Sequence, residues 1–579
     1  MCGATHHPAV TTKYTFKAES RLLSCHDDRV AETSNTGVVL RIRGVLLSLL
    51  ALAVVACTGE IGGGARNGPG GGPATQCAVE IKARPGLRLS SAQYVNTIRD
   101  LVGDDGFEAE LEDEPGLITQ RATRQLRDAA ENIVARRGQW TREVFPCDTS
   151  GAEDLACLNT FIDEFGGRTF RRPVTDTEEM RLRDAYDFAR GEALDFDGAM
   201  EVVLQVMLQS PAFIYLLEDG VAESTDAVRL LTDHEVAARL SYFLWSSTPD
   251  DELMAAAAAG YLSTADGLRA EAERLLDDSR AKDSINHYMA EFLQLNGGRL
   301  HYPLEEVTKD PALYPEVDAA LLAAMRLETN ALIERVVFDG NGTFEDLLTT
   351  REAYVNGPLA TLYGVAKGPP DADTFEWVTL PDDRAGVLTR AAFLTTYSTA
   401  TVTAPIRRGV WIRRELLCHA LGEPPANVDD TPLEGGANGE GEVLTVREAT
   451  DVRTMTEGLC AGCHSQINPL GYPFEGFDAI GRTQETEVVS GEPVDTLTDI
   501  TGTDFAGSIT DAVALSAALA ASEDARSCFA SKFLDGALGG EPPDACAGTE
   551  DAFVADGDIK NLLVSIVASD AFRYLNVEE

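Results

Sequence analysis

The chain is short of positive charge. Its 579 residues include 48 Lys and Arg against 94 Asp and Glu, which gives a formal net charge of -46. This excess of negative charge repels phosphate backbones and anionic lipid headgroups, so it excludes nucleic-acid binding. Because 44% of the residues are hydrophobic, the chain can still bury several cores. The composition is that of an acidic, globular, exported protein.

Common catalytic signatures are also missing. The sequence contains no G-x-S-x-G elbow, no phosphate-binding loop and no H-E-x-x-H run. It does contain carboxylate clusters such as Asp250–Glu252, but in a chain this acidic such clusters are typical of solvated faces. The sequence therefore supports no particular catalytic residue.

The N-terminal apolar run is too short to cross a bilayer. Val45–Ala56 follows Arg41 and Arg43 and precedes Cys57, as in a signal peptide with a basic segment, a short apolar segment and a cleavage site. Its end resembles a bacterial lipobox, which predicts lipidation at Cys57. The alternative is an ordinary signal peptide with an incidental cysteine. Residues 1–40 are interpreted as the product of a start codon placed too early.

A glycine-rich tether follows the predicted anchor. Residues 58–84 include Gly62–Gly64 and a Gly/Pro-rich run at 67–73. Such a linker lets a lipid-anchored domain stand away from a membrane. Thr58 differs from the Asp that retains bacterial lipoproteins at the inner membrane. We therefore expect an outer-membrane lipoprotein that faces the periplasm or the cell surface.

A C-x-x-C-H run occurs at residues 460–464, with the spacing that attaches a c-type haem. We predict one covalent haem c, held by Cys460 and Cys463, with His464 as the proximal iron ligand. The alternatives are a structural disulfide beside a histidine and half of a zinc site. A zinc site needs a second Cys/His pair, and the sequence has no second C-x-x-C and no H-x-x-x-H.

The sixth iron ligand must come from upstream of the motif, or the iron is open on that side. No Met and no His follows His464, so the downstream axial Met of a simple cytochrome c is missing. His419 is the candidate distal ligand, and a surface histidine is the alternative. Met455 lies too close in sequence to reach the opposite haem face. Without a distal ligand the iron would be open to small molecules, whereas six-coordinate iron favours electron transfer.

Two further features have candidate roles beside the haem. Asn468-Pro469-Leu470-Gly471 is predicted to form a turn, in which the Pro469 carbonyl would accept the N–H of the proximal imidazole. The alternative is a turn without this role. Arg407 and Arg408 would bind the haem propionates or, alternatively, pair with acidic neighbours.

The remaining cysteines suggest disulfides. Apart from the leader, the anchor and the haem pair, the cysteines are Cys77, Cys147, Cys157, Cys418, Cys528 and Cys546. An even number in an oxidising compartment is typical of disulfide bonding, although spacing alone does not fix the connectivity. Cys147 with Cys157 and Cys528 with Cys546 are the candidates close in sequence. Cys77 and Cys418 would be paired over a long loop or free.

The rest of the chain favours helices. Apolar residues recur at helical spacing over Ser91–Leu101, Glu178–Arg190, Asp197–Gln209, Asp233–Trp245, Ala265–Leu276, Ala281–Leu295, Glu316–Asp339 and Ile406–Cys418. Thr232 and Glu235 have the form of a capping box. Strand signals are short, at Phe375–Leu380 and Thr483–Val489. We predict a mainly α fold with several helical domains in series and a cytochrome c-like haem module.

An internal similarity relates Val203–Leu216 (VLQVMLQSPAFIYL) to Leu562–Leu575 (LLVSIVASDAFRYL). In both segments an amphipathic helix stops at a serine that is followed by aromatic residues. A duplicated docking element is one interpretation. The other is a helix-stop pattern used twice for packing.

Several segments together resemble the secreted planctomycete-type multidomain cytochromes, which are also found in myxobacteria and contain domains of unknown function. The segments that carry this resemblance are Leu89–Leu101, Phe170–Thr175, Arg239–Leu253, Tyr354–Asn356 with Leu359-Ala360 and Tyr363-Gly364, Arg384–Cys418, Cys460–Arg482, and a C-terminal domain from Asp504 to Arg573. The resemblance implies a cytochrome module around the C-x-x-C-H run. It implies no settled biochemical activity.

The predicted organisation is a series of six regions. They are a leader with signal peptide (1–57), the tether (58–84), N-terminal helical domains (85–222), a central helical domain (223–372), a cytochrome module (383–486) and a C-terminal helical domain (500–579). We expect electron transfer with a redox partner protein, at a membrane bound through the lipid anchor. The alternatives are a non-redox binding lipoprotein and a haem enzyme acting on a small molecule.

Overall fold

The computed structural model describes residues 87–112, 119–221, 228–298, 301–340, 342–422, 436–437, 443–456, 458–538 and 547–576. These residues all belong to one compact unit of the chain, Gly72–Glu579. The predicted signal peptide, the lipidation site Cys57 and the tether lie outside the described residues, as do Cys77 and Cys546.

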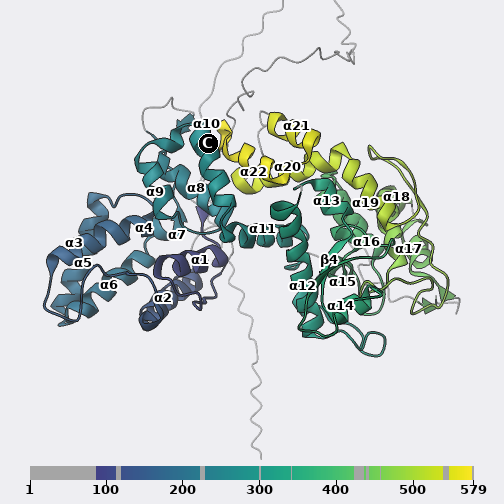
Figure 1. The fold of residues 1–579 in the computed structure, drawn as a ribbon, viewed down its shortest axis with the longest axis horizontal. Helices are drawn as coiled ribbons and strands as arrows, with labels where there is room; N and C mark the ends of the chain where they lie inside the picture. Colours follow the sequence, from purple (N-terminus) through teal and green to yellow (C-terminus); the bar gives the residue numbers. More distant parts are fainter. Residues whose placement is uncertain are drawn as a thin grey trace, which may run out of the picture. The chain divides into compact units, whose positions relative to one another are not determined.

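Helices make up most of the described chain, and the strands form two-stranded pairs (Figure 1). This confirms the predicted mainly α fold. The first helical group comprises β1 (Leu87–Arg88), α1 (Ser91–Val102), α2 (Gln120–Ala135), η1 (Arg137–Gln139), α3 (Leu155–Thr160), the π-helical η2 (Phe161–Phe165), α4 (Gly166–Phe170), α5 (Asp176–Gly191), α6 (Phe196–Leu208), α7 (Pro211–Ile214) and β2 (Tyr215–Leu216).

The second group begins at β3. Its first elements are β3 (Val228–Leu230), α8 (Asp233–Trp245), α9 (Asp251–Ala258), η3 (Tyr261–Ser263), α10 (Ala265–Leu276), α11 (Ser279–Phe292), η4 (Leu304–Glu306), α12 (Ala319–Glu334), the π-helical η5 (Arg335–Asp339), α13 (Phe344–Thr349), β4 (Glu352–Val355), α14 (Gly357–Leu362), β5 (Glu376–Thr379), η6 (Val387–Thr389) and α15 (Ala391–Thr396).

The second group continues to the C-terminal strand. These elements are α16 (Pro405–Trp411), the π-helical η7 (Ile412–Leu416), β6 (Gly436–Ala437), β7 (Val443–Leu444), α17 (Val446–Thr454), α18 (Gly458–Gly471), η8 (Tyr472–Gly476), β8 (Thr498–Ile500), β9 (Gly507–Ile509), α19 (Ala512–Ala521), α20 (Glu523–Leu538), α21 (Ala547–Asp556), α22 (Ile559–Val567), α23 (Asp570–Arg573) and β10 (Tyr574–Asn576).

Local sequence explains where several helices begin. Helices α1, α5, α8 and α17 start at capping boxes, whose N-cap residues are Ser90, Thr175, Thr232 and Thr445. In each box the hydroxyl accepts the N3 backbone N–H, while the N3 Gln or Glu accepts the N-cap backbone N–H. Two otherwise unpaired donors are thereby satisfied at each helix start. The capping box predicted at Thr232 is confirmed.

The described residues form two hydrophobic cores. The first contains apolar residues from Leu89 to Ile214 together with Tyr242 of α8. The second extends from Leu231 to Phe572 and is continuous. Helix α22 packs against α10 within it (Figure 1). The ranges predicted as a central domain, a cytochrome module and a C-terminal domain therefore share one core.

The two similar segments of the sequence have equivalent structures. Each consists of a helix, a short helix and a strand, and that strand pairs antiparallel with the first strand of its own group: β2 with β1, and β10 with β3. The Leu89 backbone N–H donates to the Ile214 carbonyl (2.9 Å), and the Leu231 N–H donates to the Arg573 carbonyl (2.9 Å). Each segment thus closes one helical group, which favours the packing interpretation.

In each of the two similar segments a backbone carbonyl accepts a hydrogen bond from a buried arginine. The Arg171 guanidinium donates to the Phe213 carbonyl (2.9 Å), and the Arg239 guanidinium donates to the Phe572 carbonyl (2.8 Å). Arg239 also forms a two-pronged ion pair with Glu218 (2.6 and 2.8 Å), in which both side chains are less than a tenth exposed. The ion pair ties α8 to the segment after β2, and the bond to the Phe572 carbonyl ties α8 to α23.

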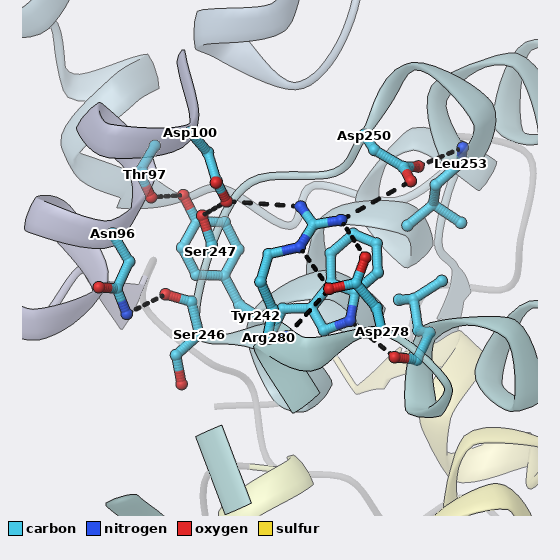
Figure 2. A network of polar contacts seen from close by, with 12 residues as sticks. Asn96, Thr97, Asp100, Tyr242, Ser246, Ser247, Asp250, Leu253, Asp278 and Arg280 are labelled. Carbon is cyan, nitrogen blue, oxygen red and sulfur yellow. Dashed lines mark hydrogen bonds and ion pairs between the residues drawn. The ribbon is translucent and has the colours of Figure 1, made fainter. Parts of the chain in front are cut away.

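Polar contacts join the first helical group to α8 and α11 (Figure 2). The Tyr242 hydroxyl and the Thr97 hydroxyl are 2.7 Å apart, and the Ser247 hydroxyl donates to Asp100 (2.6 Å). Arg280 lies 3.5 Å from the same Asp100 carboxylate. The end of α8 and the residues that follow it therefore form the joint between the two groups.

Predicted and observed elements agree closely for the strongly periodic helices. Helices α8 and α10 have the predicted bounds, and β5 lies inside the predicted strand Phe375–Leu380. The predicted strand Thr483–Val489 is wrong. That segment holds isolated β-bridges and a tight turn, in which the Glu487 N–H donates to the Glu492 carbonyl (2.9 Å) and Gly491 has φ +73°. Glycine adopts this left-handed conformation at little cost.

Replacing Arg239 tests the closure at the C-terminal end. Arg239→Met would leave the Glu218 carboxylate buried without a partner, so we expect the protein to lose about 3–5 kcal/mol of stability. We also expect faster hydrogen exchange in α22, α23 and β10. Denaturant unfolding and hydrogen-exchange mass spectrometry measure these two effects.

Two variants serve as controls for this prediction. Arg183→Ala removes the exposed Arg183–Glu179 pair on α5 and should change stability by less than about 1 kcal/mol. Arg239→Met combined with Glu218→Leu should recover part of the loss, since no charge then stays buried alone. Equal losses for Arg239→Met and Arg183→Ala would contradict the assigned role.

Candidate functional site

The C-x-x-C-H residues lie on one face of helix α18. Cys460, Cys463 and His464 occupy positions i, i+3 and i+4, which are neighbours on a helix surface. Both cysteines are free thiols; Cys463 is exposed and Cys460 half-buried. His464 is also half-buried. The face thus presents two thiols and an imidazole together, with no disulfide between the thiols.

Helix α18 is held by a close crossing with α16. A Cβ atom added to Gly409 of α16 would lie 2.1 Å from the Ile467 carbonyl oxygen, and one added to Gly471 of α18 would lie 2.0 Å from the Pro405 carbonyl oxygen. No side chain fits at these distances. Glycine at both positions therefore allows the two backbones to touch and fixes the position of α18.

His464 is oriented by Asn468, one turn further along α18. The His464 Nδ1 atom lies 2.9 Å from the Asn468 Oδ1 atom. The Asn468 amide in turn donates to the Thr454 hydroxyl (2.9 Å), which donates to the Thr450 carbonyl (2.7 Å). Within the described residues His464 Nε2 has no hydrogen-bond partner.

The predicted role of Pro469 is wrong. Asn468, Pro469 and Gly471 belong to helix α18 and not to a turn after the motif. In a helix the residue four positions after His464 shares its face, so the Asn468 side chain takes the place expected for the Pro469 carbonyl. Pro469 has no N–H to donate to the carbonyl four residues earlier, which is tolerated here within the last turn of the helix.

Arg408 is a buried structural residue, and its predicted binding of a propionate is wrong. Its side chain is fully buried and donates to the carbonyls of Phe474 (3.3 Å) and Leu394 (3.2 Å). Its guanidinium also lies 3.7 Å from the Glu475 carboxylate, which accepts the Thr403 hydroxyl (2.6 Å). The alternative of pairing with an acidic neighbour applies, and the pair joins α16 to η8.

Burial shifts the pKa values of this pair in opposite directions. Desolvation raises the pKa of Glu475 to about 7, although the Arg408 charge opposes the shift. Desolvation lowers the pKa of Arg408 to about 10, against the attraction of Glu475. Both shifts have the same cause, because each charged form loses contact with water.

Two other arginines lie near α18. Arg407 is half-buried, and burial lowers its pKa. Arg413, on the π-helical η7, is 5% exposed and donates to the side chain of Gln466 on α18 (2.8 Å). Within the described residues Nε and Nη1 of Arg413 have no hydrogen-bond partner. Of the two predicted propionate ligands, Arg407 is thus the one whose guanidinium is not committed to a buried ion pair.

Two disulfides are present in the described chain. Cys147 is joined to Cys157, and Cys418 is joined to Cys528. The expected pairing of Cys528 with Cys546 is therefore wrong. Helix α20 packs against η7, which brings together cysteines separated by 110 residues. Proximity in sequence did not predict the pairing of Cys418 with Cys528, because the contact between α20 and η7 forms only in the tertiary structure.

The candidate distal ligand His419 follows Cys418 directly. Its Nε2 atom lies 3.1 Å from the Asp524 carboxylate on α20, and its Nδ1 atom is buried without a partner in the described residues. To bind iron through Nε2, His419 would have to give up the contact with Asp524. Met455, which lies too close in sequence to reach the opposite haem face, is 40% exposed at the end of α17.

The donor set of the α18 face fits a c-type haem. Two free thiols are available for thioether bonds, and a histidine whose Nδ1 is occupied offers Nε2 to iron.

In the part of the chain that the structure describes, no group of three or more His, Cys, Asp and Glu is arranged to hold a metal ion. None of its helices combines the length and apolar character needed to cross a membrane.

Comparison with protein families gives three matches in sequence order. PSD5, a protein of unknown function (DUF1595), matches residues 157–218; PSD4, a protein of unknown function (DUF1592), matches residues 231–365; and PSCyt3, a protein of unknown function (DUF1588), matches residues 384–487. These are planctomycete cytochrome c-associated domains, and a multidomain family of this kind fits the chain. The third match contains the α18 face. No curated protein and no solved structure matches the chain.

Asn468 and Thr454 were not predicted as supports of His464. The signal for Asn468 was its i+4 spacing from His464, which becomes informative once the motif is placed on a helix. Thr454 had no comparable signal, because its contact with Asn468 crosses from α17 to α18.

The raised pKa of Glu475 makes the free energy of unfolding depend on pH. The folded protein holds this proton up to a pH of about 7, whereas the ordinary pKa is 4.5. Its contribution to the free energy of unfolding is therefore largest at low pH and falls as the pH rises from 4.5 to about 7. Glu475→Gln, which cannot ionise, should gain stability relative to the unaltered protein over this interval.

Denaturant midpoints measured at both ends of the interval test this prediction. The exposed Glu345 provides a matched control, since Glu345→Gln removes a carboxylate from the surface. A stability difference between Glu475→Gln and the unaltered protein that does not change with pH would contradict the assigned burial of charge.

Proposed function

We propose that the chain is an exported c-type haem protein that passes electrons to or from a partner protein. Cys460 and Cys463 would hold one haem c through thioether bonds, and His464 would bind the iron. The observation that supports this most directly is the α18 face, where two free thiols and an oriented imidazole lie together. The family matches support a haem-related role.

Each residue of the face has a separate task. A bound haem c would supply one-electron chemistry. Cys460 and Cys463 would prevent its loss, and the half-buried His464 would donate the Nε2 lone pair. Asn468 would keep the imidazole in place, while the crossing at Gly409 and Gly471 would hold the face rigid.

The proposed place of action is the cell envelope. Haem of this type is attached outside the cytoplasm, which agrees with the predicted signal peptide. Lipidation of Cys57 would anchor the chain at the outer membrane, and the tether would let the helical unit face the periplasm or the cell surface. A redox protein in the same compartment would be the partner.

A haem protein acting on a small molecule is the second candidate. It is favoured by the contact of His419 with Asp524, which occupies the nitrogen that would otherwise bind iron. Iron left with one protein ligand is open on its other side, where a small molecule binds.

Covalent haem attachment is the first prediction. The mature protein, expressed with cytochrome c maturation factors, should give the pyridine haemochrome spectrum of haem c and stain for haem on a denaturing gel. The double variant Cys460→Ala/Cys463→Ala should lose the stain completely, while Ser465→Ala on the same helix should keep it. An unaltered protein without covalent haem would leave the tethered, non-redox binding lipoprotein as the better account.

Binding of carbon monoxide to the reduced haem distinguishes electron transfer from action on a small molecule. If electron transfer is the function, the reduced haem should not bind carbon monoxide, and His419→Ala should make it do so. Absorption spectra of the reduced protein with and without the gas measure this. Binding by the unaltered protein, unchanged in His419→Ala, would contradict electron transfer through a six-coordinate iron and support the second candidate.

A further inference from the structure

A chain of three hydrogen bonds leads from His464 to the backbone of α17. It passes from His464 Nδ1 to Asn468 Oδ1 (2.9 Å), from the Asn468 amide to Thr454 Oγ1 (2.9 Å), and from Thr454 to the Thr450 carbonyl (2.7 Å). Asn468 is 1% exposed, Thr454 5% and Thr450 0%. Water therefore does not compete for the two bonds that involve Thr454, and their directions matter.

The direction of each hydrogen bond follows from the Thr450 carbonyl, where the series of three bonds ends. A carbonyl only accepts, so the Thr454 hydroxyl must donate its single hydrogen to Thr450. The Thr454 oxygen is then an acceptor, and the Asn468 amide must turn its NH2 group toward it. This leaves Asn468 Oδ1 facing His464. Because that oxygen also only accepts, the proton of the neutral imidazole must sit on Nδ1.

We propose that Asn468, oriented by Thr454, is the positioning residue that fixes His464 in the Nδ1–H tautomer and so makes Nε2 the iron-binding atom. This inference rests on the proposed function and adds the residue that selects the ligand atom. A backbone carbonyl would do the same task without a choice of orientation. An amide side chain has two ends, so it needs a hydrogen-bond partner to present the correct one; Thr454 does this, and the Tyr472 hydroxyl also contacts the Asn468 side chain.

The tautomer is measurable without haem. The full mature chain, expressed without haem ligation and labelled with 15N-histidine, should show His464 as the Nδ1–H form at a pH where imidazole is neutral. His464→Gln assigns the signal by its loss. The Nε2–H form in the unaltered protein would overturn the proposal, and this result requires no destabilised variant.

A matched pair of variants at Thr454 tests the orienting step. Thr454→Val keeps the shape of the side chain but removes its hydroxyl, so the Asn468 amide keeps only its contact with the Tyr472 hydroxyl and a mixture of tautomers should appear. Thr454→Ser keeps the hydroxyl and should retain the Nδ1–H form. Identical tautomers in Thr454→Val, Thr454→Ser and the unaltered protein would contradict the role of Thr454.

The haem-loaded protein gives an independent measurement. Asn468→Leu removes the acceptor from Nδ1–H and makes the imidazole a weaker donor to iron, so the midpoint potential should rise. An unchanged potential with haem still attached would overturn the proposal while leaving the proposed function intact. Absence of haem from the unaltered protein would instead refute the proposed function, and the tautomer would still decide the role of Asn468.

Discussion

The crossing of α16 and α18 is the constraint on which the candidate site depends. Its two glycines, Gly409 and Gly471, bring the helix backbones into contact, so α18 has little freedom to rotate or slide. Rotation of α18 about its axis would turn the face that carries the two thiols and His464 in another direction. The buried pair of Arg408 and Glu475 then holds the end of this crossing, at a desolvation cost that the carbonyl and hydroxyl contacts partly offset.

Buried charges recur where segments distant in sequence meet. Glu328 of α12 and Arg390 lie 3.3 Å apart and are fully buried, and Glu328 also accepts the Tyr363 hydroxyl (2.8 Å). Arg384 donates to the Thr389 carbonyl (3.0 Å) and stacks on the Tyr363 ring. Such groups contribute little net stability, but they penalise any packing that leaves them unpaired. They connect the segment matched by PSD4 to the segment matched by PSCyt3.

Much of the helical architecture could be predicted from the sequence, since apolar periodicity marks an amphipathic helix and a capping box marks the residue where it begins. Helix α2 was not predicted, although its buried residues Ala122, Leu126, Ala129, Ala130 and Ile133 recur at helical spacing; most of them are alanines, whose short side chains are only weakly apolar. The C-x-x-C-H residues were identified by their spacing. The Cys418–Cys528 disulfide and the support of His464 by Thr454 were not, because both depend on contacts between elements that only the tertiary fold brings together.

The central claim is that the α18 face carries a covalent haem. Mass spectrometry of a tryptic digest tests it most directly, because Arg453 and Arg482 release the peptide Thr454–Arg482, which contains both thiols of the motif. The account predicts that this peptide from the mature protein carries the added mass of one haem and resists alkylation. A peptide of unmodified mass whose two cysteines both react with iodoacetamide would contradict it.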